Sequence, residues 1–166
     1  DLDCKFGIKF LWQNPIPHFS WQIAENFDLK AIVPIMETFS KDHVPFYIET
    51  QGLAHFDGEE MVLYVKIMPE KQVIEMHKKL WTLLLAHSKM VSMLYSPKSG
   101  IPHITLASLG RTEAKMREIE QFLATDSFLW RMRVDNILLV SQSSEDSFDV
   151  SHRFQLGEGL IVQDVP

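Results

Sequence analysis

Apolar and polar residues alternate in several short stretches of the chain, which is the pattern of half-buried β-strands. Between these stretches, apolar residues recur three and four positions apart, the spacing of amphipathic helices. The alternating stretches predict strands at residues 5–12, 16–23, 46–51, 53–56, 61–67, 102–109, 128–134, 137–140 and 148–156. The helical spacing predicts helices at residues 29–41, 70–90 and 112–125. This mixture predicts an α+β fold.

Residue types at the element ends refine these boundaries. Asp28 and Thr112 are typical helix N-cap residues. Pro34 lies inside the first helix, where proline removes a hydrogen bond and clashes with the preceding turn. We therefore expect the regular part of that helix to begin nearer Val33. After Gly157 we expect a tail without secondary structure.

Composition limits the class of protein. The chain has 166 residues, 46% of them hydrophobic, which suits one domain with a sizeable core. Its net charge of −6 argues against a protein that follows long nucleic acids by neutralising phosphates, but is compatible with a small phosphorylated ligand.

The same composition gives expectations about compartment and partners. Cys4 is the single cysteine, so no intrachain disulfide can form, and we expect a reducing, cytoplasmic location. No apolar run is long enough to span a bilayer, and no secretory signal is visible, so no membrane partner is expected.

A hexapeptide with the pattern Ile-Pro-His-apolar-hydroxyl-apolar occurs twice, at residues 16–21 (IPHFSW) and 101–106 (IPHITL). On a strand, His18 and Ser20 would share one face, and His103 and Thr105 would do the same in the second copy. The two histidines are 85 positions apart, close to half the chain.

The order of predicted elements around the two copies also matches. Each half gives the hexapeptide strand, then a helix and two further strands, and the strands expected at Phe46 and Arg131 again lie 85 positions apart. An internal duplication explains this repetition. The chain is therefore interpreted as a single bilobal domain over residues 1–166, with lobes built around the strands at 16–23 and 102–109. We expect one histidine in each lobe and a shared central cleft.

The two His-apolar-hydroxyl-apolar motifs, one in each half of the chain, resemble those of the two-histidine (2H) phosphoesterase superfamily, the LigT-like or 2′-5′ RNA ligase-like proteins. The resemblance extends from about residue 6 to residue 156 in element order. It implies two antiparallel sheets facing a cleft, with helices outside. It also implies metal-independent cleavage of small 2′,3′-cyclic or 2′-5′-linked nucleotide or RNA-end phosphodiesters, without a cofactor. His18 and His103 match the catalytic pair, and Ser20 and Thr105 match the phosphate-binding hydroxyls.

This implied chemistry suits the residue types. Histidine, with an ordinary pKa of about 6.5, can act as acid or base near neutral pH. One neutral and one protonated histidine would support in-line displacement at phosphorus, and exchanged roles would give the reverse, bond-sealing reaction. The sequence leaves open which histidine is the acid. The two hydroxyls can donate to the non-bridging phosphate oxygens.

Other residues carry weaker expectations. Tyr95, Lys98 and Arg153 are candidates for substrate contacts. No metal site is predicted, because the remaining histidines lack ligand spacing with nearby Cys, Asp or Glu; they are His43, His55, His77, His87 and His152. The alternative hypotheses are a module that binds a nucleotide or RNA end without turnover, and a structural domain in which the repeat is only architectural.

Overall fold

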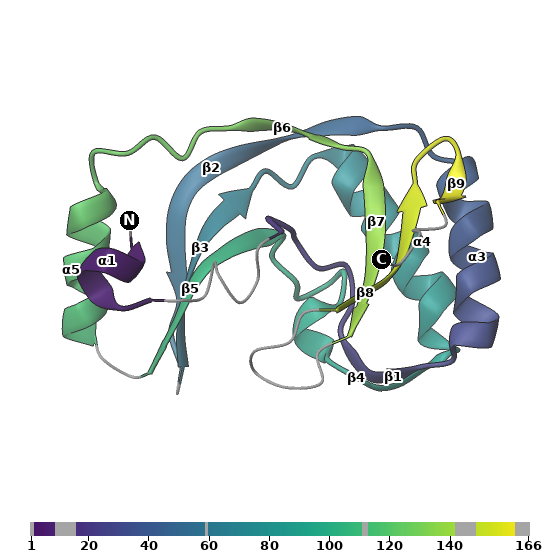
Figure 1. Cartoon of the computed structure of the whole chain (residues 1–166), viewed down its shortest axis with the longest axis horizontal. Coiled ribbons are helices and arrows are strands. Elements are labelled where there is room, and N and C mark those ends of the chain that lie inside the picture. The colour runs from purple at the N-terminus through teal and green to yellow at the C-terminus, as the bar shows by residue number, and fades with distance from the viewer. Residues whose placement is uncertain (1, 9–15, 59, 111–112, 142–148, 162–166) are drawn as a thin grey trace. The chain divides into compact units, whose positions relative to one another are not determined.

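The computed structural model describes residues 2–8, 16–58, 60–110, 113–141 and 149–161 (Figure 1). Helices and antiparallel strands are interspersed along the chain, which confirms the predicted α+β mixture.

The chain divides into two compact units, each of which combines segments from both halves of the sequence. Unit 1 consists of residues 1–19, 49–68 and 101–131. Unit 2 consists of residues 20–48, 69–100 and 132–166.

An antiparallel sheet forms the framework of unit 1. Its strands, in the order β5-β3-β2-β6, are β5 (His103–Gly110), β3 (Glu60–Ile67), β2 (Phe46–Phe56) and β6 (Arg131–Val134). Unit 1 holds β3, β5 and the larger part of β2. The helices α1 (Leu2–Phe6) and α5 (Glu113–Leu123) lie side by side next to this sheet (Figure 1).

The core of unit 1 lies between the sheet and these helices. Apolar side chains of β3 and β5 pack there against the inward stripe of α5, which was predicted from its helical spacing. The ring of Phe6 in α1 meets that of Phe122 in α5 at 5.6 Å between centroids. The buried members of this cluster are Ile8, Met61, Leu63, Ala107, Leu109, Met116, Ile119 and Leu123.

A register shift between β3 and β5 decides which residues leave this core. Leu63 pairs with Ala107, but the next residue of β3, Tyr64, pairs with Thr105, so Leu106 is the extra residue of a β-bulge. Paired residues of an antiparallel ladder share a face. Thr105 therefore lies on the face of Tyr64, opposite the core face that holds Leu63.

Strand β2 joins the two short strands predicted at residues 46–51 and 53–56. The pairing with β3 shifts between Thr50 and Leu53. Gly52 lies in this interval with φ of +94°, a conformation that L side chains rarely adopt. The glycine thus allows one continuous strand where the pattern alone indicated a break.

Unit 2 contains two longer helices and two small sheets. The helices are α3 (Leu29–Lys41) and α4 (Lys71–Leu85). One sheet pairs β1 (Ala24–Phe27) with β4 (Ser88–Val91), and the other has the order β7 (Asn136–Ser141), β8 (Asp149–Gln155), β9 (Gly159–Ile161). Helix α3 packs on β8 and β9, and α4 packs against β4. The predicted inward stripe of α4 is buried as expected: Val73, Met76, His77, Leu80, Trp81 and Leu84.

The predicted strand at residues 5–12 is wrong where the structure describes it. Residues 5 and 6 end helix α1, and Gly7, with φ of +67°, closes it. The Gly7 N–H donates to the Asp3 carbonyl at 2.8 Å and the Ile8 N–H to the Leu2 carbonyl at 3.4 Å, a helix-terminating pattern that overrides the alternation. Residues 9–12 of this prediction lie outside the described residues.

The strand predicted at residues 16–23 is also wrong, since residues 16–23 form no strand and β1 begins only at Ala24. A strand needs a partner. β4 ends at Val91, opposite Ala24, and the Ser92 N–H makes the last bond of this ribbon to the Ile23 carbonyl at 2.9 Å. The chain then turns into a single 3₁₀ turn, η1 (Met93–Tyr95), so β4 offers no pairing to residues before Ile23.

Several helix and strand ends differ from prediction. Helix α3 begins at Leu29 rather than near Val33, because the Asp28 carbonyl already accepts the N–H groups of Ala31 and Ile32, and Pro34 is contained in the helix. Asp28 occupies the predicted N-cap position without a side-chain cap bond. Helix α4 ends at Leu85, and β4 follows where the helix was expected to continue.

The C-terminal third shows similar differences. β6 starts at Arg131 rather than at residue 128, and β7 belongs to a different sheet. The predicted tail contains β9, which pairs with β8. The expected N-cap Thr112 and the polar turn at 142–147 lie outside the described residues. No helix in the described part of the chain is long and apolar enough to cross a membrane.

Candidate active site

Strand β5 places the second motif at the surface of the unit 1 sheet. His103 and Thr105 are both partly exposed, whereas Ile104 between them is buried. The face shared by His103 and Thr105 was predicted, and the β3 register confirms it, because His103 pairs with Lys66 and Thr105 with Tyr64.

Two aromatic rings hold the imidazole of His103. The rings of Phe56 and Tyr64 stack at 4.2 Å between centroids, and the centroid of His103 lies 5.0 Å from each. Both contacts are edge-on or tilted, geometries that aromatic pairs favour. Ring contacts from β2 and β3 thus restrict the orientation of the imidazole.

The first motif has no strand to hold its histidine, yet both copies share one local hydrogen bond. His18 Nδ1 donates to the Ile16 carbonyl at 2.7 Å, and His103 Nδ1 donates to the Ile101 carbonyl at 2.6 Å. In each case proline separates donor and acceptor residues. Because a carbonyl accepts, the proton of a neutral ring sits on Nδ1, and Nε2 is the basic nitrogen in both histidines.

The two histidines also belong to one unit and influence each other. Both lie in unit 1, whereas the sequence led us to expect one in each lobe. Burial lowers the pKa of His103 below its ordinary value of 6.5; the bond to the Ile101 carbonyl opposes this shift, and the positive charge of His18 adds to it. The site therefore favours a neutral His103 when His18 carries a proton.

Comparison with known protein families settles where the chain belongs. A family model described as the 2′-5′ RNA ligase superfamily matches residues 14–146, which include both hexapeptides. The chain belongs to the 2′-5′ RNA ligase superfamily. No protein with a curated description matches it.

Membership of the 2′-5′ RNA ligase superfamily confirms the resemblance inferred from the two motifs. It supports a phosphoesterase or ligase of the two-histidine type in general, since the superfamily is generally enzymatic. The match covers the motif residues of both copies and ends before Arg153.

The other predicted site residues lie in unit 2. Ser20 is the first residue of unit 2 and is half-buried. Lys98 is exposed on the loop before the second motif. Tyr95 is half-buried at the end of η1; burial raises the pKa of its phenol, and its carbonyl accepts a bond from His77 Nε2 at 2.9 Å. Arg153 is half-buried on β8, where it pairs with Leu138.

Sequence reasoning missed three residues around His103, namely Phe56, Tyr64 and Lys66. Phe56 and Tyr64 touch the imidazole, and Lys66 is its neighbour across the β3–β5 ladder. They come from strands that read simply as apolar or alternating. Only the register connects them with the motif, although Lys66 stood out as a charge within an otherwise apolar strand.

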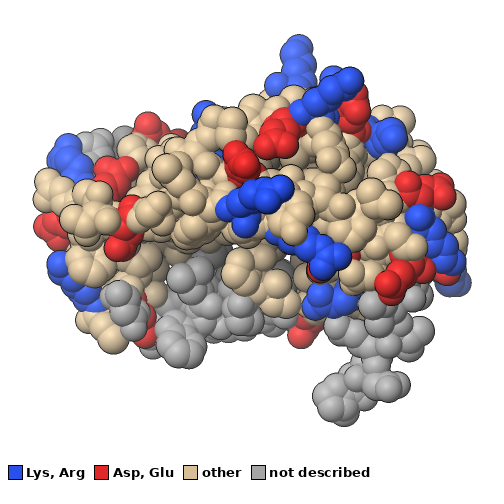
Figure 2. Space-filling model, turned by 90° about the horizontal axis from the view of Figure 1, so that it is seen from above, with Lys and Arg blue, Asp and Glu red and all other residues tan. Residues whose placement is uncertain are grey.

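His55 lies on the opposite face of the same sheet. It pairs with Leu63, a core residue, and its Nδ1 lies 2.7 Å from Glu120 of α5 while its Nε2 lies 3.3 Å from Asp57. Within the described ranges, no group of three or more His, Cys, Asp or Glu side chains is arranged to hold a metal ion. On the face drawn in Figure 2, Lys and Arg side chains are interspersed with Asp and Glu rather than forming one basic surface.

Proposed function

We propose that this chain is a metal- and cofactor-independent phosphodiesterase of the two-histidine type. Its substrates are small 2′,3′-cyclic or 2′-5′-linked nucleotide or RNA-end phosphodiesters. The observation that carries the proposal is the matched pair His18 and His103, each with Nδ1 bonded to the carbonyl two residues before it. This pairing leaves the same nitrogen, Nε2, to exchange protons in both rings.

The two histidines take different roles in this proposal. His103, whose pKa is lowered by burial and by the charge of His18, is the neutral base. On a cyclic substrate, His103 Nε2 takes a proton from water, the water oxygen attacks phosphorus, and protonated His18 delivers its proton to the leaving ribose oxygen. The products are a phosphomonoester and a free hydroxyl. When a 5′-hydroxyl replaces water as the nucleophile, the same two proton transfers join its oxygen to phosphorus and release the ribose 3′-oxygen as a hydroxyl, which leaves a 2′-5′ linkage.

The motif hydroxyls of Ser20 and Thr105 are proposed to donate to the non-bridging phosphate oxygens, where charge builds up in the transition state. We expect Thr105→Val, which keeps the side-chain shape, to lower kcat/KM about 10- to 100-fold, and Thr105→Ser to retain most of it. Steady-state hydrolysis of a 2′,3′-cyclic nucleotide measures both. Equal activity of the valine variant would remove Thr105 from the phosphate site.

The role assignment predicts a specific pH dependence. Because the folded-state pKa of His103 is lowered, its neutral, basic form persists below the ordinary value of 6.5. We therefore expect kcat/KM to fall on the acid side only at a pH below about 6.5, as His103 becomes protonated. Histidine NMR titration checks the cause: His18→Gln should raise the pKa of His103 by removing the neighbouring charge. An unchanged or lowered pKa in that variant would contradict the coupling.

Hydrolysis of nucleoside 2′,3′-cyclic monophosphates in excess EDTA tests the proposal as a whole. EDTA-resistant turnover supports it. If the chain binds these substrates and 2′-5′-linked dinucleotides through its histidines but does not turn them over, it is a binding module rather than an enzyme.

A further inference from the structure

The phenol of Tyr64 has no role in the reaction proposed above, yet it lies beside both motif residues of β5. Tyr64 pairs with Thr105 across the β3–β5 ladder, so the two side chains leave the same face of the sheet. Their Cβ atoms are then about 4.5–5.5 Å apart. The ring of His103 reaches the same place, since its centroid lies 5.0 Å from that of Tyr64. All three residues belong to unit 1.

The ring of Tyr64 is not available to a ligand. The residue is 5% exposed. Phe56 stacks on the ring at 4.2 Å between centroids with 26° between the planes, and His103 meets it at 59°. A nucleobase needs a free aromatic face on which to stack, and Tyr64 offers none. Any contact that Tyr64 makes with a substrate is therefore made by its hydroxyl.

The hydroxyl of Tyr64 reaches solvent although the ring is buried. It makes no hydrogen bond within the described residues, where Gln22 Oε1 alone is a buried side-chain polar atom without a partner. The phenol oxygen is therefore not buried, and its O–H can donate to a ligand. Burial of the side chain raises the pKa of this phenol above its ordinary value of 10.0, so the donor keeps its proton at neutral pH.

A phosphate bound for the proposed reaction lies close to this hydroxyl. The attacking water stands between His103 Nε2 and phosphorus, so phosphorus is one water away from the imidazole. The phenol oxygen is fixed to a ring that contacts this imidazole, on the residue paired with the proposed phosphate donor Thr105. Each non-bridging oxygen can accept more than one hydrogen bond, so Thr105 leaves room for a second donor.

We propose that the Tyr64 hydroxyl donates a hydrogen bond to a non-bridging oxygen of the substrate phosphate. Strand β3 thereby adds a third phosphate-binding hydroxyl to those of Ser20 and Thr105. The bond strengthens as negative charge builds on that oxygen in the transition state. This inference rests on the proposed phosphodiesterase function and deepens it, because it names a further substrate contact of the same reaction.

Tyr64→Phe tests the contact, because it keeps the ring and removes one oxygen. The probe is adenosine 2′-monophosphate, the product of hydrolysis of the cyclic nucleotide, and its Kd is measured by NMR titration. This Kd should rise about tenfold in the variant, because a hydrogen bond to a charged group is lost. The weaker binding of adenosine, which has no phosphate, should not change. An unchanged Kd for the monophosphate, or an equal rise for both ligands, would overturn the proposal.

Sulfur substitution locates the contact on the phosphate. Adenosine 2′,3′-cyclic phosphorothioate has two diastereomers, each with sulfur in place of one non-bridging oxygen, and sulfur is a weak hydrogen-bond acceptor. The wild type should hydrolyse the isomer with sulfur at Tyr64 more slowly than the oxygen substrate. In Tyr64→Phe this slowing should disappear for that isomer and persist for the other. Equal slowing of both isomers in both proteins would contradict a direct bond.

Two readouts separate this role from a structural one. The pKa of His103 from NMR and the urea midpoint should match the wild type in Tyr64→Phe, because the ring contacts persist. Tyr64→Leu, which also removes the ring, should change both. If Tyr64→Phe shifts the pKa of His103 by as much as Tyr64→Leu does, the phenol acts through the histidine and the proposal is overturned.

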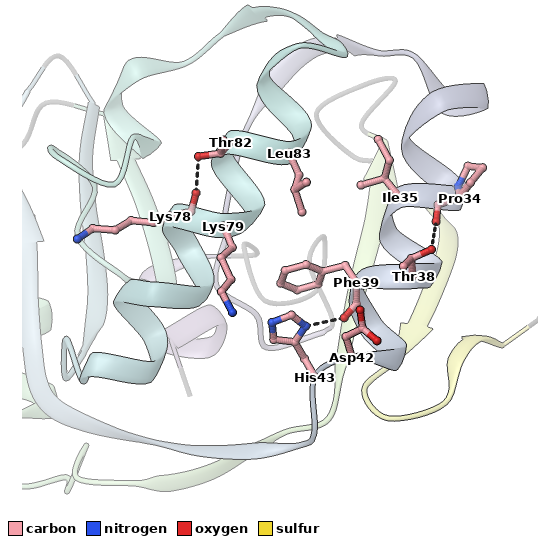
Figure 3. Close-up of a pocket in the computed structure, with 10 residues that line it drawn as sticks. All are labelled: Pro34, Ile35, Thr38, Phe39, Asp42, His43, Lys78, Lys79, Thr82 and Leu83. Atoms are coloured by element: carbon pink, nitrogen blue, oxygen red, sulfur yellow. Dashed lines mark hydrogen bonds between the residues drawn. The ribbon is translucent and has the colours of Figure 1, made fainter.

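Matched variants localise the effect. Tyr47→Phe makes the same change on a residue that is 49% exposed, and should leave the Kd within about twofold of the wild type. The groove between α3 and α4 is a rival place for a phosphate, since Lys79 and His43 point toward one end of it (Figure 3). Asp42 also lies at that end, so Lys79→Gln should leave the Kd unchanged. A larger loss in Lys79→Gln than in Tyr64→Phe would place the nucleotide there and overturn the proposal.

The outcomes distinguish this inference from the proposed function. Full binding and turnover in Tyr64→Phe, beside a loss in His103→Ala, would reject the role of Tyr64 and leave the phosphodiesterase in place. A wild type that binds adenosine 2′-monophosphate but turns over no substrate would reject the enzyme, and the Kd of Tyr64→Phe would still decide on the contact. A wild type that does not bind the monophosphate would overturn both.

Discussion

His18→Ala and His103→Ala should each reduce hydrolysis of a 2′,3′-cyclic nucleotide by about 10²- to 10⁴-fold in excess EDTA. His18→Ala removes the proposed acid, which protonates the leaving oxygen, and His103→Ala removes the proposed base, which takes the proton from water. Because the two residues act in one step, the double variant should lose little more activity than the more damaged single variant. Initial rates of phosphomonoester formation measure all three.

The matched control for these variants is His55→Gln. His55 belongs to the same sheet and the same unit but lies on the opposite face, against Glu120. Its replacement should leave kcat/KM within about twofold of the wild type. Persistent turnover in both alanine variants, or a loss in His55→Gln as large as theirs, would reject the paired-histidine mechanism.

Leu63→Ala should lower the free energy of unfolding by about 2–5 kcal/mol. Leu63 is fully buried in the middle of β3, where it faces the core formed with α5. Truncation removes apolar contacts and leaves a cavity that a close-packed sheet cannot fill by relaxation. Urea unfolding followed by far-ultraviolet circular dichroism gives the change in midpoint at constant slope.

Leu129→Ala is the control for this prediction, because that leucine is 71% exposed. Its free energy of unfolding should change by less than about 0.5 kcal/mol. Tyr64, the residue after Leu63, contacts His103 only in the folded chain. We therefore also expect the Leu63 variant to lose turnover in proportion to the fraction of chains that are unfolded. Full stability in Leu63→Ala would contradict the core assigned to unit 1.

Local patterns carried much of the fold. The alternation of residues 61–67 correctly predicted β3, and the hexapeptide at 101–106 correctly predicted β5, the long strand that pairs with it. The apolar stripe of α4 is buried at every predicted position. In these segments, propensity, periodicity and tertiary packing agree, so one residue pattern suffices.

The errors arose where pairing partners or caps decided the outcome. Residues 16–23 alternate well, but β4 offers no pairing before Ile23, so the pattern did not become a strand. Strand β4 was missed because it is short and pairs only with β1, which is distant in the sequence. Strand β9 was missed because its three residues are too few to show a periodic pattern, although its partner β8 directly precedes it. Near the N-terminus, the closing conformation of Gly7 overrode alternation.

The site divides in the same way. The motif supplied both histidines and both hydroxyls, because their spacing in the sequence is visible without a structure. Phe56, Tyr64 and Lys66 approach His103 only through the β2–β3–β5 ladder, and no pattern within a single strand gives the register between strands. The Nδ1 bonds likewise required the local backbone path around Pro17 and Pro102.

The bulge at Leu106 has a consequence for how this strand can vary. The bulge shifts the alternation of the strand by one residue: Ala107 and Leu109 point into the core on one face of the sheet, and His103 and Thr105 lie on the opposite face. Deleting Leu106 would make Thr105 and Ala107 consecutive residues of a regular strand and leave both sets on their present faces, whereas deleting Ile104 would turn His103 to the opposite face. Strand β5 can therefore lose one residue at Leu106 and still direct its core residues and its motif residues to opposite faces of the sheet.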